Sequence, residues 1–155
     1  MLKRKVKKGF TLVEILVVVV ILGILAAIVI PQFTSASEAA KRSSILTQLQ
    51  TLRSQFEFYQ VQHNGNYPLM ATLQTGTPDN WAGMTTQTDI TGAAGADYGP
   101  YLQQAPLNGF TDGTNVAVDN SADWEYDEIT GAIRAVVPAA MITVLKLSTN
   151  DVVAQ

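Results

Sequence analysis

Few side chains in this sequence have the types and spacing that catalysis requires. The chain contains a single histidine, His63, and no cysteine. Nucleophilic hydrolysis needs a base within reach of a serine or cysteine nucleophile, and no nucleophile motif lies beside His63. A lone histidine at the end of a predicted helix is better interpreted as a capping residue that contacts the last carbonyl groups. The sequence therefore favours a protein that is not an enzyme over an exported hydrolase held by an uncleaved anchor.

Acidic residues are numerous, but they form no recognisable metal site. A calcium loop gathers its oxygen ligands within about a dozen residues, whereas Asp89, Asp97 and Asp112 are scattered. The adjacent Asp127 and Glu128 lie at a predicted turn, where carboxylates are normally solvated. We therefore predict no cofactor, and calcium is the one alternative that these oxygens leave open.

Glu14 is the carboxylate in the most unusual surroundings. From residue 10 to residue 30 it is the only charged side chain. A helix of that length spans roughly 31 Å, about the hydrocarbon thickness of a bilayer. A carboxylate at the centre of a bilayer costs about 2.5 kcal/mol or more and usually marks a function. Because Glu14 lies near one end of the run, an interfacial charge with no further role stays an alternative.

The charge distribution predicts an orientation for this membrane segment. Half of the ten basic residues crowd the first eight positions, and from residue 10 onward five basic residues face thirteen acidic ones. A positive flank stays in the cytoplasm, so the body faces outward. A cleaved secretory signal is the alternative, but its apolar region usually runs only about 7–15 residues. The body has no basic patch, which argues against a nucleic-acid partner.

The residues Lys7 to Glu14, with the sequence KKGFTLVE, resemble the class III signal of type IV prepilins and type II secretion pseudopilins. The shared features are a basic leader, a glycine, a phenylalanine, and a glutamate five positions after the glycine. The resemblance implies that a prepilin peptidase cuts between Gly9 and Phe10 and methylates the new amino group of Phe10. It also implies that Glu14 neutralises the N-terminal amine of a neighbouring subunit.

Pro31 stands where this family has a helix-interrupting proline. Proline has no amide hydrogen, so the carbonyl of Ala27 loses its helical donor. The resemblance implies a helix break that loosens when the subunit enters a filament. A static kink, or simply the exit from the membrane, are the alternatives that the sequence leaves open.

The resemblance also implies a division of the chain and a set of partners. Residues 1–9 would be a leader that is removed, residues 10–31 a transmembrane and assembly helix, and residues 32–155 a periplasmic or extracellular globular pilin domain. The protein would be a single-pass inner-membrane protein, then part of a periplasmic or surface filament. Its partners would be the prepilin peptidase, copies of itself, minor pseudopilins and an inner-membrane assembly platform.

Two functions fit this family. The first is a structural subunit of a helical pseudopilus that drives type II protein secretion, and the alternative is a type IV pilus subunit for adhesion, motility or DNA uptake. Many adhesion pilins close a C-terminal loop with two cysteines, which this chain lacks. The sequence therefore looks more like a major pseudopilin of the G type, although residues 148–155 lack the acidic, glycine-rich calcium loop often found there.

The remaining pattern predicts an α+β fold. Apolar residues at intervals of three or four extend a helix from residue 10 to residue 62, with a stop at residues 63–65. Residues 69–115 are rich in turn-forming residues. The strands are predicted at residues 116–118, 124–126, 133–137 and 142–147, with a turn at residues 129–131. The stretch from residue 124 to residue 133 is similar to the sheet hairpin of several pseudopilins. We therefore expect a long N-terminal helix, membrane-spanning in its first half, packed on a small antiparallel β-sheet of three or four strands.

Overall fold

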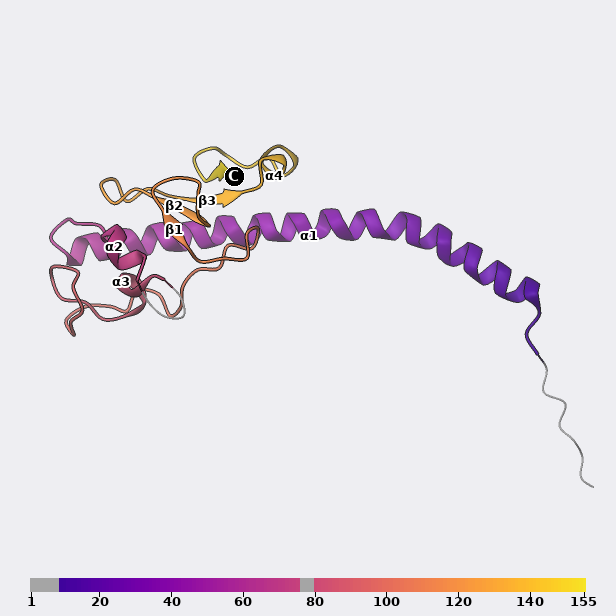
Figure 1. Ribbon diagram of the computed structural model, residues 1–155, viewed down its shortest axis with the longest axis horizontal. Helices are drawn as coiled ribbons and strands as arrows, with labels where there is room; N and C mark the ends of the chain where they lie inside the picture. Colours follow the sequence, from indigo (N-terminus) through magenta and orange to yellow (C-terminus); the bar gives the residue numbers. More distant parts are fainter. Residues whose placement is uncertain (1–8, 76–79) are drawn as a thin grey trace, which may run out of the picture. The chain divides into compact units, whose positions relative to one another are not determined.

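The computed structural model describes residues 9–75 and 80–155. The basic residues of the predicted leader lie outside this range. The chain divides into two compact units, Met1–Glu38 and Ala39–Gln155, which we describe separately. Figure 1 labels the helices and strands in chain order. We call the second unit the body.

The first helix, α1 (Leu12–Gln62), confirms the long helix that the sequence predicts, although it begins two residues later. Its end is also as predicted. Asn64 and Gly65 both adopt positive φ, at 56° and 85°, and the Gly65 amide donates to the carbonyl of Gln60 at 2.9 Å. This is the left-handed turn that commonly ends a helix and satisfies its last carbonyl groups.

The body contains a four-stranded sheet in the order β1-β2-β3-β4. Its strands are β1 (Val116–Ala117), β2 (Trp124–Tyr126), β3 (Ile133–Val137) and β4 (Val152–Ala154). The predicted hairpin of β2 and β3 is confirmed as an antiparallel pair. However, β1 pairs with β2 and β3 pairs with β4 in parallel, so the sheet is mixed and the prediction of an antiparallel sheet is wrong for these two pairs.

The prediction of a strand at residues 142–147 is wrong. Helix α4 (Ala139–Val144) takes up the first half of that segment and begins directly after Pro138, which occupies its N-cap position. A parallel connection between β3 and β4 needs a crossover, usually a helix, and α4 supplies it. The strand that completes the sheet is β4, at the end of the chain.

The core of the body lies between one face of α1 and the sheet. The helix contributes buried side chains at intervals of three or four residues: Ile45, Leu49, Leu52, Phe56 and Tyr59. The sheet contributes buried residues on its facing side, among them Trp124, Tyr126 and Ile133. The ring of Phe56 lies 5.0 Å from that of Tyr126, measured between centroids. This part of the predicted apolar stripe is therefore core.

The segment between α1 and the sheet is mostly irregular, as predicted, with two single-turn helices, α2 (Met70–Leu73) and α3 (Ala82–Thr85). Asn108 holds this segment to the sheet. It is fully buried, and its side-chain amide donates to the carbonyls of Asp123 and Val136, both at 2.7 Å. Its Oδ1 accepts from the Phe110 amide, so the buried polar group is satisfied on both sides.

Candidate assembly site at the start of α1

The predicted cleavage junction precedes the first helix. Gly9 and Phe10 lie in irregular backbone just before α1, and the side chain of Phe10 is 80 % exposed. No atom lies within 4 Å of where a Cβ on Gly9 would be. Packing within the described chain therefore does not require glycine at this position, and any requirement must come from a partner that approaches the junction.

Thr11 and Glu14 form a reciprocal cap at the start of α1. The Glu14 amide donates to Thr11 Oγ1 at 3.2 Å, and the Thr11 amide donates to Glu14 Oε2 at 3.2 Å. The Thr11 hydroxyl also lies 3.3 Å from the same carboxylate oxygen. This is the capping-box arrangement, in which a threonine and a glutamate three residues later each satisfy a free helix amide. Our sequence reasoning did not single out Thr11, although the spacing T-x-x-E carries the signal.

The cap gives Glu14 a local role and fixes where its charge lies. The carboxylate is held at the positive end of the helix dipole, which favours a negative group there. Glu14 and Thr11 are both exposed in the described chain. The carboxylate is therefore accessible to a cationic group from another molecule, beside the amide that it already binds.

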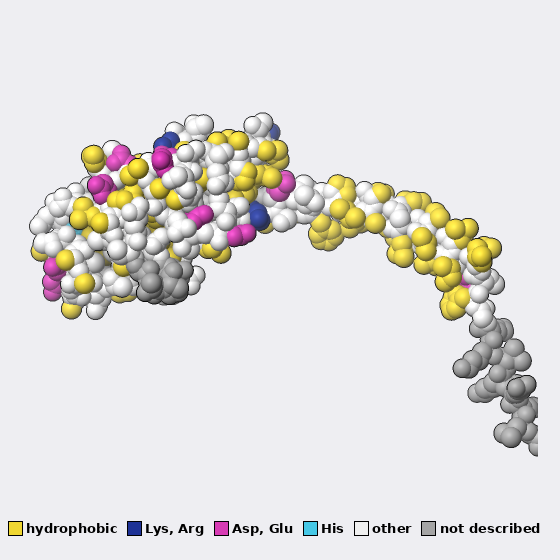
Figure 2. All heavy atoms as spheres, in the orientation of Figure 1, with side chains coloured by type: hydrophobic (Ala, Val, Ile, Leu, Met, Phe, Trp, Pro, Cys, Tyr) yellow, Lys and Arg dark blue, Asp and Glu magenta, His cyan; other side chains and the backbone are white. Residues whose placement is uncertain are grey.

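The N-terminal part of α1 exposes a nearly continuous apolar surface. Every residue from 10 to 37 is exposed within the described chain, and Figure 2 shows hydrophobic side chains along this stretch. It lies in the one helix among the described residues that is long and apolar enough to cross a membrane. Side chains such as Leu12, at 81 % exposed, are left largely uncovered by the described residues.

Pro31 does not end the helix, because α1 continues through it. One turn further on, the Thr34 hydroxyl donates to the carbonyl of Ile30 at 3.2 Å. Such back-bonding supplies polar contacts near a proline and can bend a helix. Whether this stretch loosens in a filament stays a prediction.

The remaining residues that the sequence marked for possible chemistry are used structurally. The His63 ring is buried and stacked on Tyr59, with ring centroids 3.6 Å apart. Its Nδ1 lies 2.9 Å from the Tyr59 carbonyl, a contact with the last helical turn of the kind we predicted, and its Nε2 lies 3.0 Å from the Thr88 hydroxyl. Within residues 9–75 and 80–155, neither nitrogen has a hydrogen-bond contact with a serine or cysteine side chain. The sequence did not predict that His63 is buried or that it contacts Thr88, which is distant in sequence.

The acidic residues do not converge in the described parts of the chain. No group of three or more His, Cys, Asp or Glu residues there could hold a metal ion. Asp89 instead closes a tight turn, where hydrogen bonds from the hydroxyl and amide of Thr91 hold the pKa of its carboxyl below the usual range. Asp127 behaves in the same way with Thr130 and Ile129, which lower the pKa of its carboxyl.

Comparison with known proteins agrees with the geometry at the start of α1. The family profile of the prokaryotic N-terminal methylation motif matches residues 4–30. The chain is 37 % identical over 67 residues to a type II secretion system core protein G of Klebsiella michiganensis, covering 43 % of this chain and 46 % of the relative. It is 37 % identical over 89 residues to the protein of that name from Pseudomonas aeruginosa, covering 52 % of this chain and 62 % of the relative.

A further relative is matched over most of its own length. The chain is 33 % identical over 69 residues to a ComG operon protein 3 homolog of Bacillus licheniformis, covering 44 % of this chain and 71 % of the relative. This chain spans less than half of the length of the first three core proteins G that it matches. No solved structure matches this chain. The motif at residues 4–30, the exposed apolar helix and the α+β body together show that this chain belongs to the type IV pilin-like family.

Proposed function

We propose that this chain is a pseudopilin, a structural subunit that polymerises into the helical pseudopilus of a type II secretion system. The observation that carries the proposal is the exposed start of α1. There, a carboxylate at Glu14 and an unpartnered apolar surface lie together, directly after the Gly9–Phe10 junction. An exposed apolar surface of this size requires lipid or other protein around it, and a filament of like subunits supplies such surroundings.

Processing would prepare the site. A prepilin peptidase would cut after Gly9 and methylate the amine of Phe10, leaving a cation a few residues from Glu14. Two opposite charges in a low-dielectric interior are costly apart and tolerable when paired. In the filament, the Phe10 amine of one subunit would therefore pair with Glu14 of its neighbour. This pairing would also set the axial register, as a single buried polar residue does in a coiled coil.

Before assembly, the subunit would be an inner-membrane protein with a cytoplasmic N-terminus and a periplasmic body. Residues 10–31 would span the membrane, and residues 32–155 would form the exported domain. The assembly platform and minor pseudopilins would be its further partners. The protein would have no catalytic role and no cofactor, since the side chains marked for chemistry serve to hold turns and the core.

A type IV pilus subunit for adhesion, motility or DNA uptake is the second candidate. The methylation motif belongs to pilins and pseudopilins alike and does not separate them. One relative that this chain matches over most of its length is not named a type II secretion protein, so we keep this second candidate.

The proposal is tested by expressing the full chain with a prepilin peptidase, then measuring its intact mass and N-terminal sequence. We expect a mature chain that begins at N-methyl-Phe10. A start at or beyond Ala27 would indicate an ordinary secretory signal and overturn the proposal. Deleting the gene for this chain in its source bacterium separates the two candidates. If the chain is a pseudopilin, the deletion should cause the same loss of exported enzymes as deletion of the outer-membrane secretin of the secretion system. If it is a pilus subunit, secretion should be unchanged.

A further inference from the structure

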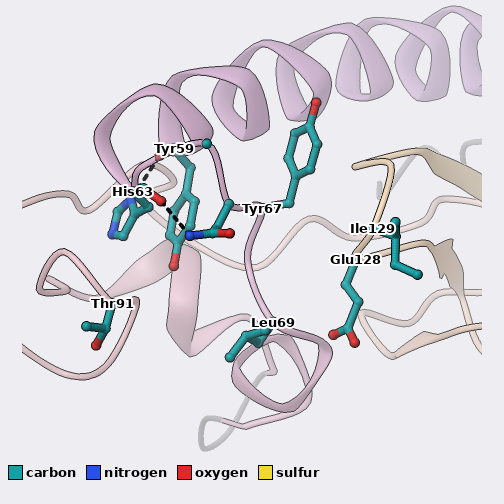
Figure 3. Close-up of a pocket in the computed structure, with 9 residues that line it drawn as sticks. Tyr59, His63, Tyr67, Leu69, Thr91, Glu128 and Ile129 are labelled. Carbon is teal, nitrogen blue, oxygen red and sulfur yellow. Dashed lines mark hydrogen bonds between the residues drawn. The ribbon is translucent and has the colours of Figure 1, made fainter.

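A hollow of about 420 Å³ opens in the body where the end of α1 meets the β2–β3 hairpin. Figure 3 shows Glu128 and Ile129 on one side of it and Tyr59 with His63 on the other. The two walls are tied together, because the ring of Tyr67 packs against Gly131, whose φ of 69° and lack of a Cβ leave room for it. This contact joins the segment after α1 to the hairpin turn.

The hollow contains one carboxylate, that of Glu128, with both polar and apolar side chains around it. Glu128 Oε2 accepts a hydrogen bond from the Met70 amide at 2.7 Å, which fixes the carboxylate. Its other oxygen, Oε1, takes part in none of the hydrogen bonds of the described residues. Beside it, Leu69 is 53 % exposed and Ile129 is 86 % exposed. Among the described residues, no lysine or arginine lines the hollow, so a ligand that combines an apolar group with a cation fits it best.

The exposure of Ile129 is built into the hairpin turn. Asp127 Oδ1 accepts from the Ile129 amide at 2.9 Å, and its Oδ2 accepts from the Thr130 hydroxyl at 2.7 Å. These bonds hold the turn in a shape that directs Ile129 outward. Turns favour small and polar residues, whereas Ile129 is large, apolar and exposed. Together with the exposed Leu69, which lines the same hollow, it leaves apolar surface free for a contact.

The body offers a complementary group at Lys146. Its five basic residues are Lys41, Arg42, Arg53, Arg134 and Lys146. The guanidinium groups of Arg53 and Arg134 pair with Asp151 and Glu125, and the Lys41 ammonium lies over the Phe110 ring. Arg42 is half-buried. Lys146 is the exposed cation that takes part in no ion pair or ring contact among the described residues.

The segment around Lys146 is held so that it presents an apolar group and a cation together. Leu145 and Leu147 are buried and anchor it, while Val144 and Lys146 point outward, with Val144 61 % exposed. An exposed valine beside an exposed lysine is complementary to the hollow, where Leu69 and Ile129 expose apolar surface and Glu128 supplies a carboxylate.

The two surfaces lie at opposite ends of β3, since the hairpin turn precedes the strand and α4 follows it (Figure 1). They cannot meet within one copy. We propose that the end of α4 in one copy docks on the hairpin hollow of the next copy, with the Lys146 ammonium on the Glu128 carboxylate and Val144 against Leu69 and Ile129. This contact is a second interface of the filament, within the bodies, and rests on the proposed function.

The geometry of such a contact suits a filament. It joins different surfaces of the two copies, so it is heterologous and repeats without closing into a dimer. One exposed ion pair with a small apolar contact is weak, so this contact orients subunits that the apolar helices hold together.

Cysteine crosslinking in the full chain tests the contact, because the chain has no cysteine of its own. The chain is co-expressed with the prepilin peptidase and assembly system of its source bacterium, and sheared filaments are oxidised mildly. A variant with both Ile129→Cys and Val144→Cys should form a ladder of disulfide-linked multimers, while each single variant should form none. Filaments of the double variant that stay monomeric on a non-reducing gel would overturn the docking.

Charge variants give an independent test. Glu128→Gln keeps an acceptor for the Met70 amide but removes the charge, and we expect a roughly two- to fivefold lower association constant for it and for Lys146→Gln. The exchange of Glu128→Lys with Lys146→Glu should assemble better than either reversal alone. Glu57→Gln, on an exposed part of α1 outside the hollow, is the matched control and should assemble normally. An exchange no better than the single reversals would refute the pairing, whereas a wild-type chain that forms no filament would refute the proposed function itself.

Discussion

The first unit and the body use apolar side chains in opposite ways. In the body, Leu49 and Trp124 have no exposed surface, because α1 and the sheet cover each other. In the first unit, Phe10 and Leu12 are 80 % and 81 % exposed. The body therefore completes its hydrophobic core within one chain, while the apolar side chains of the first unit are left for lipid or another protein to cover.

This difference separates stability from assembly. A substitution in the body core should change the free energy of unfolding and affect assembly only through it. A substitution in the first unit should leave the body folded and change membrane insertion, processing or polymerisation.

The largest effect is expected for Glu14→Ala. In a filament, the methylated Phe10 amine of the neighbour would lose its counter-charge in a low-dielectric core, which costs roughly 3–5 kcal/mol. That is a factor of a few hundred or more in the equilibrium for each added subunit. Sheared surface filaments should be lost, while a gel shift should show normal cleavage and circular dichroism a folded body.

Glu38→Ala is the control for this prediction. It removes a carboxylate from the same helix, outside the apolar run, and should assemble normally. Normal filament yield from fully processed Glu14→Ala would leave Glu14 as a capping residue only.

For Trp124→Ala we expect a loss of similar size, but in the free energy of unfolding of the body and not in assembly. The indole is fully buried, packs edge-on against Trp81 with ring centroids 6.4 Å apart, and donates to the Pro106 carbonyl at 3.0 Å. Truncation of a buried aromatic residue costs about 3–5 kcal/mol. Urea unfolding of the detergent-solubilised chain, followed by circular dichroism, measures it. Leu25→Ala, in the exposed apolar run, should leave the unfolding midpoint unchanged, and a large shift for Leu25→Ala would break the separation.

The same separation explains what the sequence could predict. The processing motif is local, so cleavage at the Gly9–Phe10 junction and the assembly role of Glu14 are predictions that need no structure, and processing and assembly experiments will test them. Helix α1 and its stop also follow from local spacing and from Gly65. The hairpin of β2 and β3 was predicted because its strands are adjacent and its turn residues are distinctive.

The wrong predictions concern features that depend on contacts between segments distant in the sequence. A parallel pairing such as β3 with β4 depends on contacts across a crossover, which no short window reveals. The apolar run Met141, Ile142 and Leu145 fits a helical interval as well as a strand, and short runs of this kind are ambiguous. The hollow beside Glu128 forms from three separate segments. The capping role of Thr11 is different, because its signal was present in the sequence.

Alkaline pH should weaken the body. Burial raises the pKa of Tyr59 to about 12 from an ordinary 10.0, and burial also raises the pKa of Tyr126. Folding therefore favours the neutral phenols, so this stability is complete below about pH 10 and declines as the pH rises from 10 toward 12. Urea midpoints measured across that window should fall. Tyr59→Phe should flatten part of the decline, and an unchanged decline in this variant would assign it to other groups.

A smaller effect is expected for Arg53→Gln. Arg53 binds the last part of the chain to α1, through Asp151 Oδ1 at 2.8 Å and the carbonyls of Ile133 and Asn150 at 3.1 Å. Hydrogen bonds to charged groups are worth about 1.5–3 kcal/mol, and solvent access to this side chain favours the lower end. Arg134→Gln, which breaks the surface pair with Glu125, should cost no more than about 1 kcal/mol. Equal losses of stability for the two variants would show that Arg53 stabilises the body no more than an ordinary surface ion pair does.

The smallest effect is expected for Thr11→Val, which keeps the shape of the side chain but removes the hydroxyl that accepts from the Glu14 amide. Loss of an N-cap costs about 1 kcal/mol, and here it frays only the first turn of α1. Hydrogen exchange of the first α1 amides in detergent should speed up, while cleavage, body stability and most filament yield should persist. Thr11→Ser should restore protection because serine caps as well. If Thr11→Val instead abolished filaments as fully as Glu14→Ala, the Thr11 hydroxyl would have a role in assembly beyond the cap. Thr11 could then no longer be assigned to helix stability alone, with polymerisation assigned to Glu14.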